Sequence, residues 1–153
     1  MFSTISARTE LRGARVLDCY AGSGALGIEA LSRGAGHALF VESNRRAAAV
    51  LVENLASLGL RDAVVRACTV DALAAARAGE PYDLLVADPP YALHGESLSG
   101  ALASLNGNGW LADGALLAVE RPVRAGEFTW PDGVEQITTR RYGDTLVCYG
   151  RRP

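Results

Sequence analysis

The sequence predicts an α/β fold, a doubly wound and mainly parallel sheet of seven strands that ends in a β-hairpin. Short apolar runs alternate with helix-like segments between residues 15 and 120, which is typical of β-α repeats. A glycine-rich turn with the spacing G-x-G-x-x-G follows the first apolar run. From residue 134 onward the helix-like segments stop, and two strand-like segments flank Tyr142-Gly143-Asp144. A chain of 153 residues suits a single domain, residues 1–153, with a substantial core.

The individual elements follow from local patterns. The helix that begins after Asn44 has apolar residues along one side, with Asn44 as its N-cap and Gly59 at its end. The run from Tyr82 to Asp88 is mostly apolar, as expected for a strand buried on both faces. The predicted strands cover residues 16–17, 37–42, 62–68, 82–88, 115–120, 134–141 and 145–149, and the predicted helices cover residues 25–33, 44–58, 71–78 and about 97–105.

Composition and charge exclude several classes of protein. The formal net charge is −2, so no overall positive field attracts nucleic acid. No apolar run of ~20 residues is present, and the N-terminus lacks the layout of a secretory signal, so we expect a cytoplasmic protein without a membrane span. Cys19, Cys68 and Cys148 are far apart, which predicts reduced core cysteines and neither a disulfide nor a metal site. We expect a monomer that needs no metal.

The stretch from Arg15 to Gly27 indicates a nucleotide-like cofactor. A strand, a glycine turn and a helix N-terminus let backbone N–H groups approach a ligand, because glycine has no Cβ. Asp18 stands four residues before Gly22, where its charge would repel a pyrophosphate but would suit an ammonium and a sulfonium group. The pattern therefore favours S-adenosylmethionine (SAM) over NAD, and a tight turn without a ligand is the plain alternative.

Acidic residues stand at or just beyond the ends of four consecutive parallel strands, and these ends meet at one edge of such a sheet. Besides Asp18 they are Glu42, Asp71 and Asp88. Glu42, about 20 residues beyond the glycine turn, has the position from which a carboxylate accepts both hydroxyls of an adenosine ribose; the alternative is a solvated strand-end acid. Asp71 is a candidate acceptor for the adenine amino group or, equally, the N-cap of the next helix.

Asp88-Pro89-Pro90-Tyr91 predicts a site for a planar amine. Two prolines after a buried strand make a stiff loop, since each fixes φ and lacks an N–H donor. The Asp88 carboxylate and a proline carbonyl then offer two acceptors for the two hydrogens of one NH₂ group, which helps to localise its lone pair toward a methyl donor. Tyr91 offers a stacking face to a flat base. The plain alternative is a turn with a surface tyrosine.

These motifs resemble the bacterial 16S ribosomal RNA guanine-N2 methyltransferases of the RsmD type, within the Rossmann-like class I SAM-dependent fold. The resemblance covers roughly residues 13–150, and its other marks include residues 28–35 and Asn108-Gly109-Trp110-Leu111. It implies SAM as cofactor, and a guanine of 16S ribosomal RNA, presented on an assembling 30S particle, as methyl acceptor. The residues expected to hold the acceptor amine are Asp88, Pro89, Pro90 and Tyr91, and those expected to bind SAM are Asp18, Tyr20, Ala21, Gly22, Ser23, Gly24, Gly27, Glu42, Ser43, Asp71 and Ala72.

The front of the chain departs from that family. The resemblance implies a further basic N-terminal segment with a helix that lies over the cofactor site and helps to hold RNA, whereas fourteen residues precede Arg15 here. We therefore expect cofactor chemistry to be retained and RNA affinity to be reduced, because electrostatics usually dominates that affinity. The remaining candidate RNA contacts, which would otherwise be solvated surface residues, are Arg121, Arg124, Arg140 and Arg141.

Other functions compatible with these motifs stay open. D-P-P-Y loops also serve adenine-N6 methylation in DNA, and related N-P-P-Y loops serve a glutamine amide in protein, which Asp at position 88 disfavours. A non-catalytic SAM-binding RNA module is an alternative of a different class. An NAD-dependent oxidoreductase is a third, disfavoured by Asp18 and by the D-P-P-Y loop.

Overall fold

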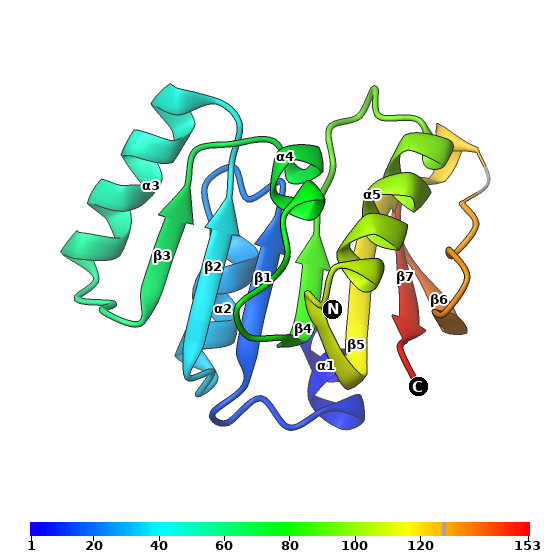
Figure 1. The fold of residues 1–153 in the computed structure, drawn as a ribbon, viewed down its shortest axis with the longest axis horizontal. Coiled ribbons are helices and arrows are strands. Elements are labelled where there is room, and N and C mark those ends of the chain that lie inside the picture. Colours follow the sequence, from blue (N-terminus) through cyan, green and yellow to red (C-terminus); the bar gives the residue numbers. More distant parts are fainter. Residues whose placement is uncertain (127) are drawn as a thin grey trace.

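The computed structural model describes residues 1–126 and 128–153 (Figure 1). Five β-α units are followed by an antiparallel hairpin, as the sequence predicts. The strands are β1 (Arg15–Cys19), β2 (His37–Val41), β3 (Ala63–Arg66), β4 (Tyr82–Ala87), β5 (Leu111–Pro122), β6 (Glu135–Tyr142) and β7 (Thr145–Arg151). The helices are α1 (Phe2–Arg8), α2 (Ala25–Ser32), α3 (Arg45–Ser57), α4 (Val70–Ala75), α5 (Gly95–Gly107) and the short 3₁₀ helix η1 (Val123–Ala125).

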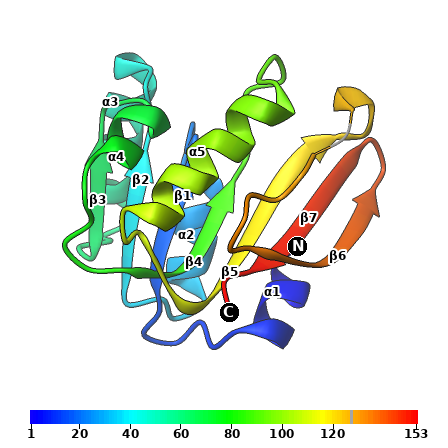
Figure 2. The ribbon, with the colours of Figure 1, turned by 45° about the vertical axis from the view of Figure 1, so that its right-hand side comes forward.

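The seven strands form one twisted sheet with the order β3-β2-β1-β4-β5-β7-β6 (Figure 2). Strands β1 to β5 run parallel, and β7 pairs antiparallel with both β5 and β6. The chain reverses its direction of travel across the sheet between β3 and β4, so the carboxyl ends of β1 and β4 lie beside each other at the switch point. Open α/β sheets bind their ligands at this point.

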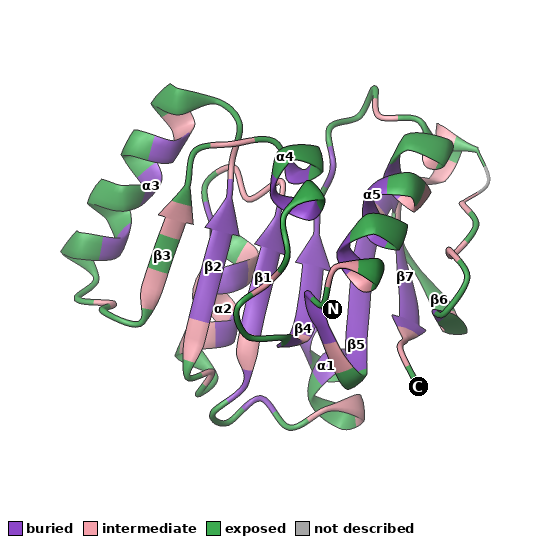
Figure 3. Ribbon diagram, viewed as in Figure 1, coloured by how far each residue is buried: buried purple, intermediate pink, exposed green. Residues whose placement is uncertain are grey.

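Helices cover both faces of the sheet, so its central strands are buried on both sides (Figure 3). Leu17, Leu85 and Leu117 pack toward α4 and α5, whereas Val16, Leu84 and Leu116 pack toward α1, α2 and α3. Complete burial of one such leucine contributes about 1.5–3 kcal/mol relative to exposure. The strand apolar on both faces that the sequence predicts at residues 82–88 is therefore confirmed.

Several boundaries differ from the predicted ones by a few residues, among them the following three. Strand β5 begins at Leu111, not at Ala115, because Leu111 pairs with Tyr82 ahead of a register shift after which Leu116 pairs with Leu84. The turn between β6 and β7 is one residue shorter than predicted at its front, since Tyr142 still pairs with Thr145. Helix α4 begins at Val70, one residue before its predicted start.

The two ends of the chain lie together. Phe2 and Ile5 of α1 are buried in the same cluster as Tyr149 of β7. The hydroxyl of Tyr149 donates to the carbonyl of Met1 at 3.4 Å, and the guanidinium of Arg151 donates to the carbonyl of Arg8 at 2.8 Å. In the part of the chain that the structure describes, no helix has both the length and the apolar character needed to cross a membrane.

Candidate functional site

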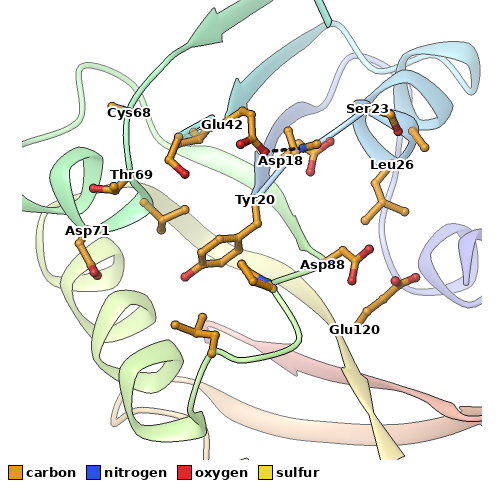
Figure 4. Close-up of a pocket in the computed structure, with 18 of the residues that line it drawn as sticks. Asp18, Tyr20, Ser23, Leu26, Glu42, Cys68, Thr69, Asp71, Asp88 and Glu120 are labelled. Carbon is orange, nitrogen blue, oxygen red and sulfur yellow. Dashed lines mark hydrogen bonds between the residues drawn. The ribbon is translucent and has the colours of Figure 1, made fainter. Parts of the chain in front are cut away.

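A cavity of about 660 Å³ opens at the carboxyl ends of the parallel strands, where the sequence places the site (Figure 4). Its lining comes mainly from the loops after β1, β2, β3 and β4, and from Glu120 of β5. Of the residues expected to bind the cofactor, the cavity is lined by Asp18, Tyr20, Ala21, Gly22, Ser23, Glu42, Ser43 and Asp71, and of those expected to hold the amine it is lined by Asp88 and Pro90. Gly24, Gly27 and Ala72 lie behind this lining.

The loop after β1 is held in a fixed shape by its backbone. Tyr20 has a φ of +58°, the one positive φ at a non-glycine residue in the described ranges. Such a conformation costs about 1–3 kcal/mol and persists only where the surroundings impose it. Here the next N–H, that of Ala21, donates to the carbonyl of Val41 at 2.9 Å. The turn projects the half-buried Tyr20 ring into the middle of the cavity (Figure 4).

Glu42 joins two loops of the site. Its Oε1 accepts the N–H of Gly22 at 2.8 Å, and its Oε2 accepts the N–H of Asn44 at 2.7 Å. Each oxygen keeps a lone pair for another donor, because a carboxylate has about four acceptor positions. Glu42 is therefore not simply a solvated strand-end acid: it fixes the glycine turn against the start of α3.

The glycines of the G-x-G-x-x-G turn do different things. Gly22 needs its positive φ of +56° and has open space around it. A Cβ on Gly24 would stand 2.3 Å from Leu51 Cδ1, and a Cβ on Gly27 would stand 2.4 Å from Phe40 Cε1. Gly24 and Gly27 thus let α2 pack closely on the sheet, and their contribution to the site is indirect.

Asp18 is buried under the glycine turn, with 1% of its surface exposed. Its Oδ2 accepts the N–H of Gly27 at 2.9 Å, so the carboxyl caps the first turn of α2. Burial raises its pKa to about 8, the Gly27 bond opposes this, and the nearby Asp88, Glu120 and Glu42 raise it further. Asp18 lines the cavity, where a cationic ligand would favour its ionised form.

Asp71 lies in the first turn of α4 and faces the cavity (Figure 4). The alternative that Asp71 caps this helix is wrong: the cap is Thr69, whose Oγ1 accepts the N–H of Ala72 at 3.0 Å. Ala72 contributes to that cap and does not line the cavity. Cys68 lines the cavity and is only half buried, so the prediction that all three cysteines lie in the core is correct for Cys19 and Cys148 alone.

The proline loop after β4 borders two cavities. Asp88 lines both the large cavity and a neighbouring one of about 350 Å³, whereas Pro89 and Tyr91 line only the second. The carbonyl of Pro90 accepts the N–H of Leu93 at 2.9 Å, which closes the loop on itself. Tyr91 is 63% exposed, and the guanidinium of Arg124 lies 5.3 Å from its ring centre.

Glu120 is a site residue that the sequence analysis missed. It follows Val119, the last residue of β5 that pairs with β4. Its side chain lines both cavities and points toward Asp88 (Figure 4). The two carboxyls face each other (Figure 4), and burial raises the pKa of each. The proximity of Asp88 raises the pKa of Glu120 further. Strand-end acids are common, and only the pairing of Val119 with Ala87 reveals that these two meet.

Arg121 corrects the prediction of a surface arginine or RNA contact. It is 2% exposed and donates to the carbonyls of Leu93 at 3.0 Å and Ala125 at 3.3 Å, so it holds the loops on either side of the second cavity. Arg124, Arg140 and Arg141 are exposed, as expected. Over the described ranges, no group of three or more histidine, cysteine or acidic side chains has the arrangement of a metal site.

Comparisons with known proteins agree with this architecture. The magnesium protoporphyrin IX methyltransferase (ChlM) from Synechocystis PCC 6803 with bound SAM is 15% identical, covers 99% of this chain and 76% of its own, and has a TM-score of 0.75. That likeness concerns the fold, and it confirms the predicted class I methyltransferase architecture with its seven-stranded, mainly parallel sheet.

Closer similarity connects the chain with bacterial proteins. The ribosomal RNA small subunit methyltransferase D of Escherichia coli (strain K12) is 43% identical over 119 residues, which are 77% of this chain and 58% of that relative. A solved structure described as the putative methyltransferase yhhF from Escherichia coli has a TM-score of 0.88 at 34% identity, with 99% of this chain and 82% of that one covered. The family model "Conserved hypothetical protein 95" matches residues 1–151. The chain therefore belongs to this family, and the resemblance to the RsmD-type methyltransferases that its motifs indicate is confirmed.

Proposed function

We propose that this protein transfers the methyl group of SAM to the N2 amine of a guanine in 16S ribosomal RNA. One observation carries the proposal: a single cavity joins the loops after β1, β2 and β3, which suit the cofactor, to Asp88 and Pro90, which suit the acceptor amine. The name of the E. coli relative, ribosomal RNA small subunit methyltransferase D, supports the acceptor class.

The cavity suits SAM in size and in charge. Small-molecule sites measure roughly 300–1,000 Å³. The carboxyls of Glu42, Asp88 and Glu120 each raise the pKa of the buried Asp18, which describes a site with an excess of negative charge. A cation would relieve this excess, whereas the pyrophosphate of NAD would increase it. The same charge therefore argues against the oxidoreductase alternative.

In this site Glu42 would accept the ribose hydroxyls with the lone pairs that Gly22 and Asn44 leave free. Asp71 would accept the adenine amino group from the first turn of α4. SAM supplies an electrophilic methyl group on a sulfonium centre. Ala21, Ser23 and Ser43 line the same end of the cavity and would complete the surface around the cofactor.

Where the large cavity meets the neighbouring one at Asp88, Asp88 and the Pro89 carbonyl would accept the two hydrogens of the guanine N2 amine. These bonds turn the nitrogen lone pair toward the methyl group and hold it in line with the carbon that it attacks, and such positioning supplies much of the acceleration in a displacement. The nitrogen is cationic once the N–C bond has formed and the S–C bond has broken, and Asp88 is then at hand to accept its proton. Tyr91 would stack on the base.

The net charge of the chain is −2, so its overall charge does not attract RNA, and binding must depend on local basic residues. Exposed Arg124, Arg140 and Arg141 lie on or near the rim formed by η1 and the hairpin and would contact phosphates. The segment that aligns with the E. coli relative makes up 58% of that protein. We propose that an assembling small-subunit particle is the preferred acceptor.

Two measurements test the proposal. Calorimetric titration should show SAM binding, and tighter binding of NADH would contradict the assignment. Small-subunit particles that lack guanine-N2 methyl groups should then gain radioactive methyl groups from labelled SAM, on a guanine. SAM binding without any transfer would favour the non-catalytic module, and label in DNA adenine would favour a DNA methyltransferase.

A further inference from the structure

Glu120 has no role in the function proposed above, yet it stands beside the acceptor site. Val119 pairs with Ala87, so the next residues along these parallel strands lie at the same level: Glu120 within β5, and Asp88 just beyond the end of β4. Both line the large cavity and the neighbouring one, and their side chains point toward the same space (Figure 4). The strand pairing therefore holds two carboxyls side by side where the acceptor amine would enter.

This pair of carboxyls has no cation to neutralise it. The ion pairs formed by the described residues involve Glu80, Glu29 and Asp113, and neither member of the pair. The nearest buried guanidinium, that of Arg121, donates to main-chain carbonyls instead. Two adjacent acceptors without donors make a favourable site for a ligand that presents two adjacent donors.

We propose that Glu120 determines the specificity for guanine by accepting its N1–H while Asp88 accepts a hydrogen of the neighbouring N2 amine. This inference rests on the proposed function and names a residue that the function does not itself require. Guanine carries N1–H and N2–H side by side on one edge, which matches two adjacent carboxylates. Adenine carries an unprotonated N1 beside its amine, so its lone pair would face the carboxylate of Glu120.

The role proposed for Glu120 predicts that the enzyme distinguishes guanine from 2-aminopurine, although both bases carry the same N2 amine. 2-Aminopurine keeps the N2 amine of guanine but has an unprotonated N1, so a carboxylate at position 120 should reject it. A glutamine there keeps the size of glutamate and can donate its amide N–H to that N1. One well-formed hydrogen-bonded pair at a base edge is worth about ten- to a hundredfold in discrimination.

The experiment compares the unaltered chain, Glu120→Gln and the matched control Glu53→Gln, whose side chain is exposed on α3 away from the cavity. The labelled guanine is first located in unmethylated small-subunit particles. Particles are then assembled from ligated 16S RNA with either guanine or 2-aminopurine at that position, and kcat/KM for methyl transfer is measured on both. Circular dichroism and SAM titration accompany every variant, and Glu120→Asp, which keeps the carboxylate, is a second variant if Glu120→Gln unfolds.

We expect the unaltered chain and Glu53→Gln to prefer guanine by about tenfold or more, and Glu120→Gln to lose that preference while its SAM affinity changes little. Glu120→Asp should keep the preference for guanine at a lower rate. Equal loss on both bases by Glu120→Gln, with the preference unchanged, would assign Glu120 a merely structural role and overturn the inference alone. Absence of transfer to guanine by the unaltered chain would overturn the proposed function, and this inference with it.

Discussion

The two halves of the cavity differ in how their carboxyl groups are held. On the side of β1 and β2, Asp18 and Glu42 accept main-chain N–H groups at 2.7–2.9 Å, so each acid is fixed by the backbone of a neighbouring loop. On the side of β4 and β5, Asp88 and Glu120 face each other, and Tyr91 is 63% exposed. The proposed cofactor half is complete in the free protein, whereas the acceptor half holds groups that still need donors.

The two halves therefore depend differently on their ligands. A backbone-held carboxylate changes little when its ligand binds, which lowers the entropy cost of binding a small molecule. A pair of facing carboxyls gains most of its stabilisation from the ligand itself. We therefore expect the cofactor half to bind in isolation and the acceptor half to determine transfer. Substitutions in the two halves should separate these properties.

The largest expected effect is that of Asp88→Ala. Methyl transfer to small-subunit particles should fall by about a hundredfold or more, because the acceptor amine loses the group that orients it. SAM affinity should stay within a few-fold, as measured by calorimetry, and Asp132→Ala, an exposed turn residue, is the control. Loss of SAM binding by a folded Asp88→Ala variant would show that the two halves are not separable.

Glu42→Ala should show the opposite pattern. Loss of a charge-assisted contact to both ribose hydroxyls costs roughly 1.5–3 kcal/mol, or about ten- to a hundredfold in SAM affinity. The SAM affinity of Glu42→Gln should lie between those of the unaltered chain and Glu42→Ala, since the single amide oxygen of glutamine can accept only one of the hydrogen bonds from Gly22 and Asn44. Unchanged SAM affinity in a folded Glu42→Ala variant would remove Glu42 from the cofactor site.

Gly27→Ala tests whether the fold around the cofactor half depends on the close packing of α2 against Phe40 of β2. Its Cβ would stand 2.4 Å from Phe40 Cε1 and 3.0 Å from Asp18 Oδ2. Overpacking of this kind costs about 1–3 kcal/mol, which corresponds to a fall of roughly 3–9 °C in Tm at this chain length. Gly100→Ala in α5 is the matched control, because its Cβ meets nothing within 4 Å and the helix should gain stability. Equal Tm values for both variants would contradict the packing argument.

The last prediction concerns how the stability of the protein depends on pH. The pKa of Asp18 is about 8 in the folded protein, above its usual 3.8, so the folded state retains a proton that the unfolded state releases. The free energy of unfolding should therefore fall as the pH rises from about 4 to 8 and then level off. Asp18→Asn keeps an oxygen that can accept the Gly27 N–H, and because asparagine does not ionise, it removes the fall in the free energy of unfolding with pH that Asp18 causes. Its Tm advantage should grow steadily as the pH rises from about 4 to 8, and an advantage that is independent of pH would contradict the raised pKa.

The sequence predicts most of this fold because its signals are local. Alternating apolar runs, the Asn44 cap and the Pro89-Pro90 break each depend on neighbouring residues, and each lies where expected. The same is true of the glycine turn and of Glu42, which stand in a short motif with fixed spacing. These residues are close together in the sequence and also close together in the cavity.

What the sequence could not predict depends on the register between distant strands. Glu120 meets Asp88 only because Val119 pairs with Ala87, and nothing near Glu120 in the sequence indicates that pairing. Arg121 looks like any polar residue after a strand, but β5 continues past it and η1 folds back to accept its hydrogen bond. Gly24 and Gly27 resemble ligand-binding glycines until Leu51 and Phe40 are seen to pack against them.

The contact between the first helix and the last strand also determines when the protein can finish folding during translation. Met1 and Arg8 precede their partners Tyr149 and Arg151 by 148 and 143 residues in the sequence. At a translation rate of about 10 residues per second, Phe2 and Ile5 wait roughly 14 s for the strand that completes their cluster. Until β7 has left the ribosome, α1 has an exposed apolar face, and a nascent chain stalled before β7 should be a client of chaperones.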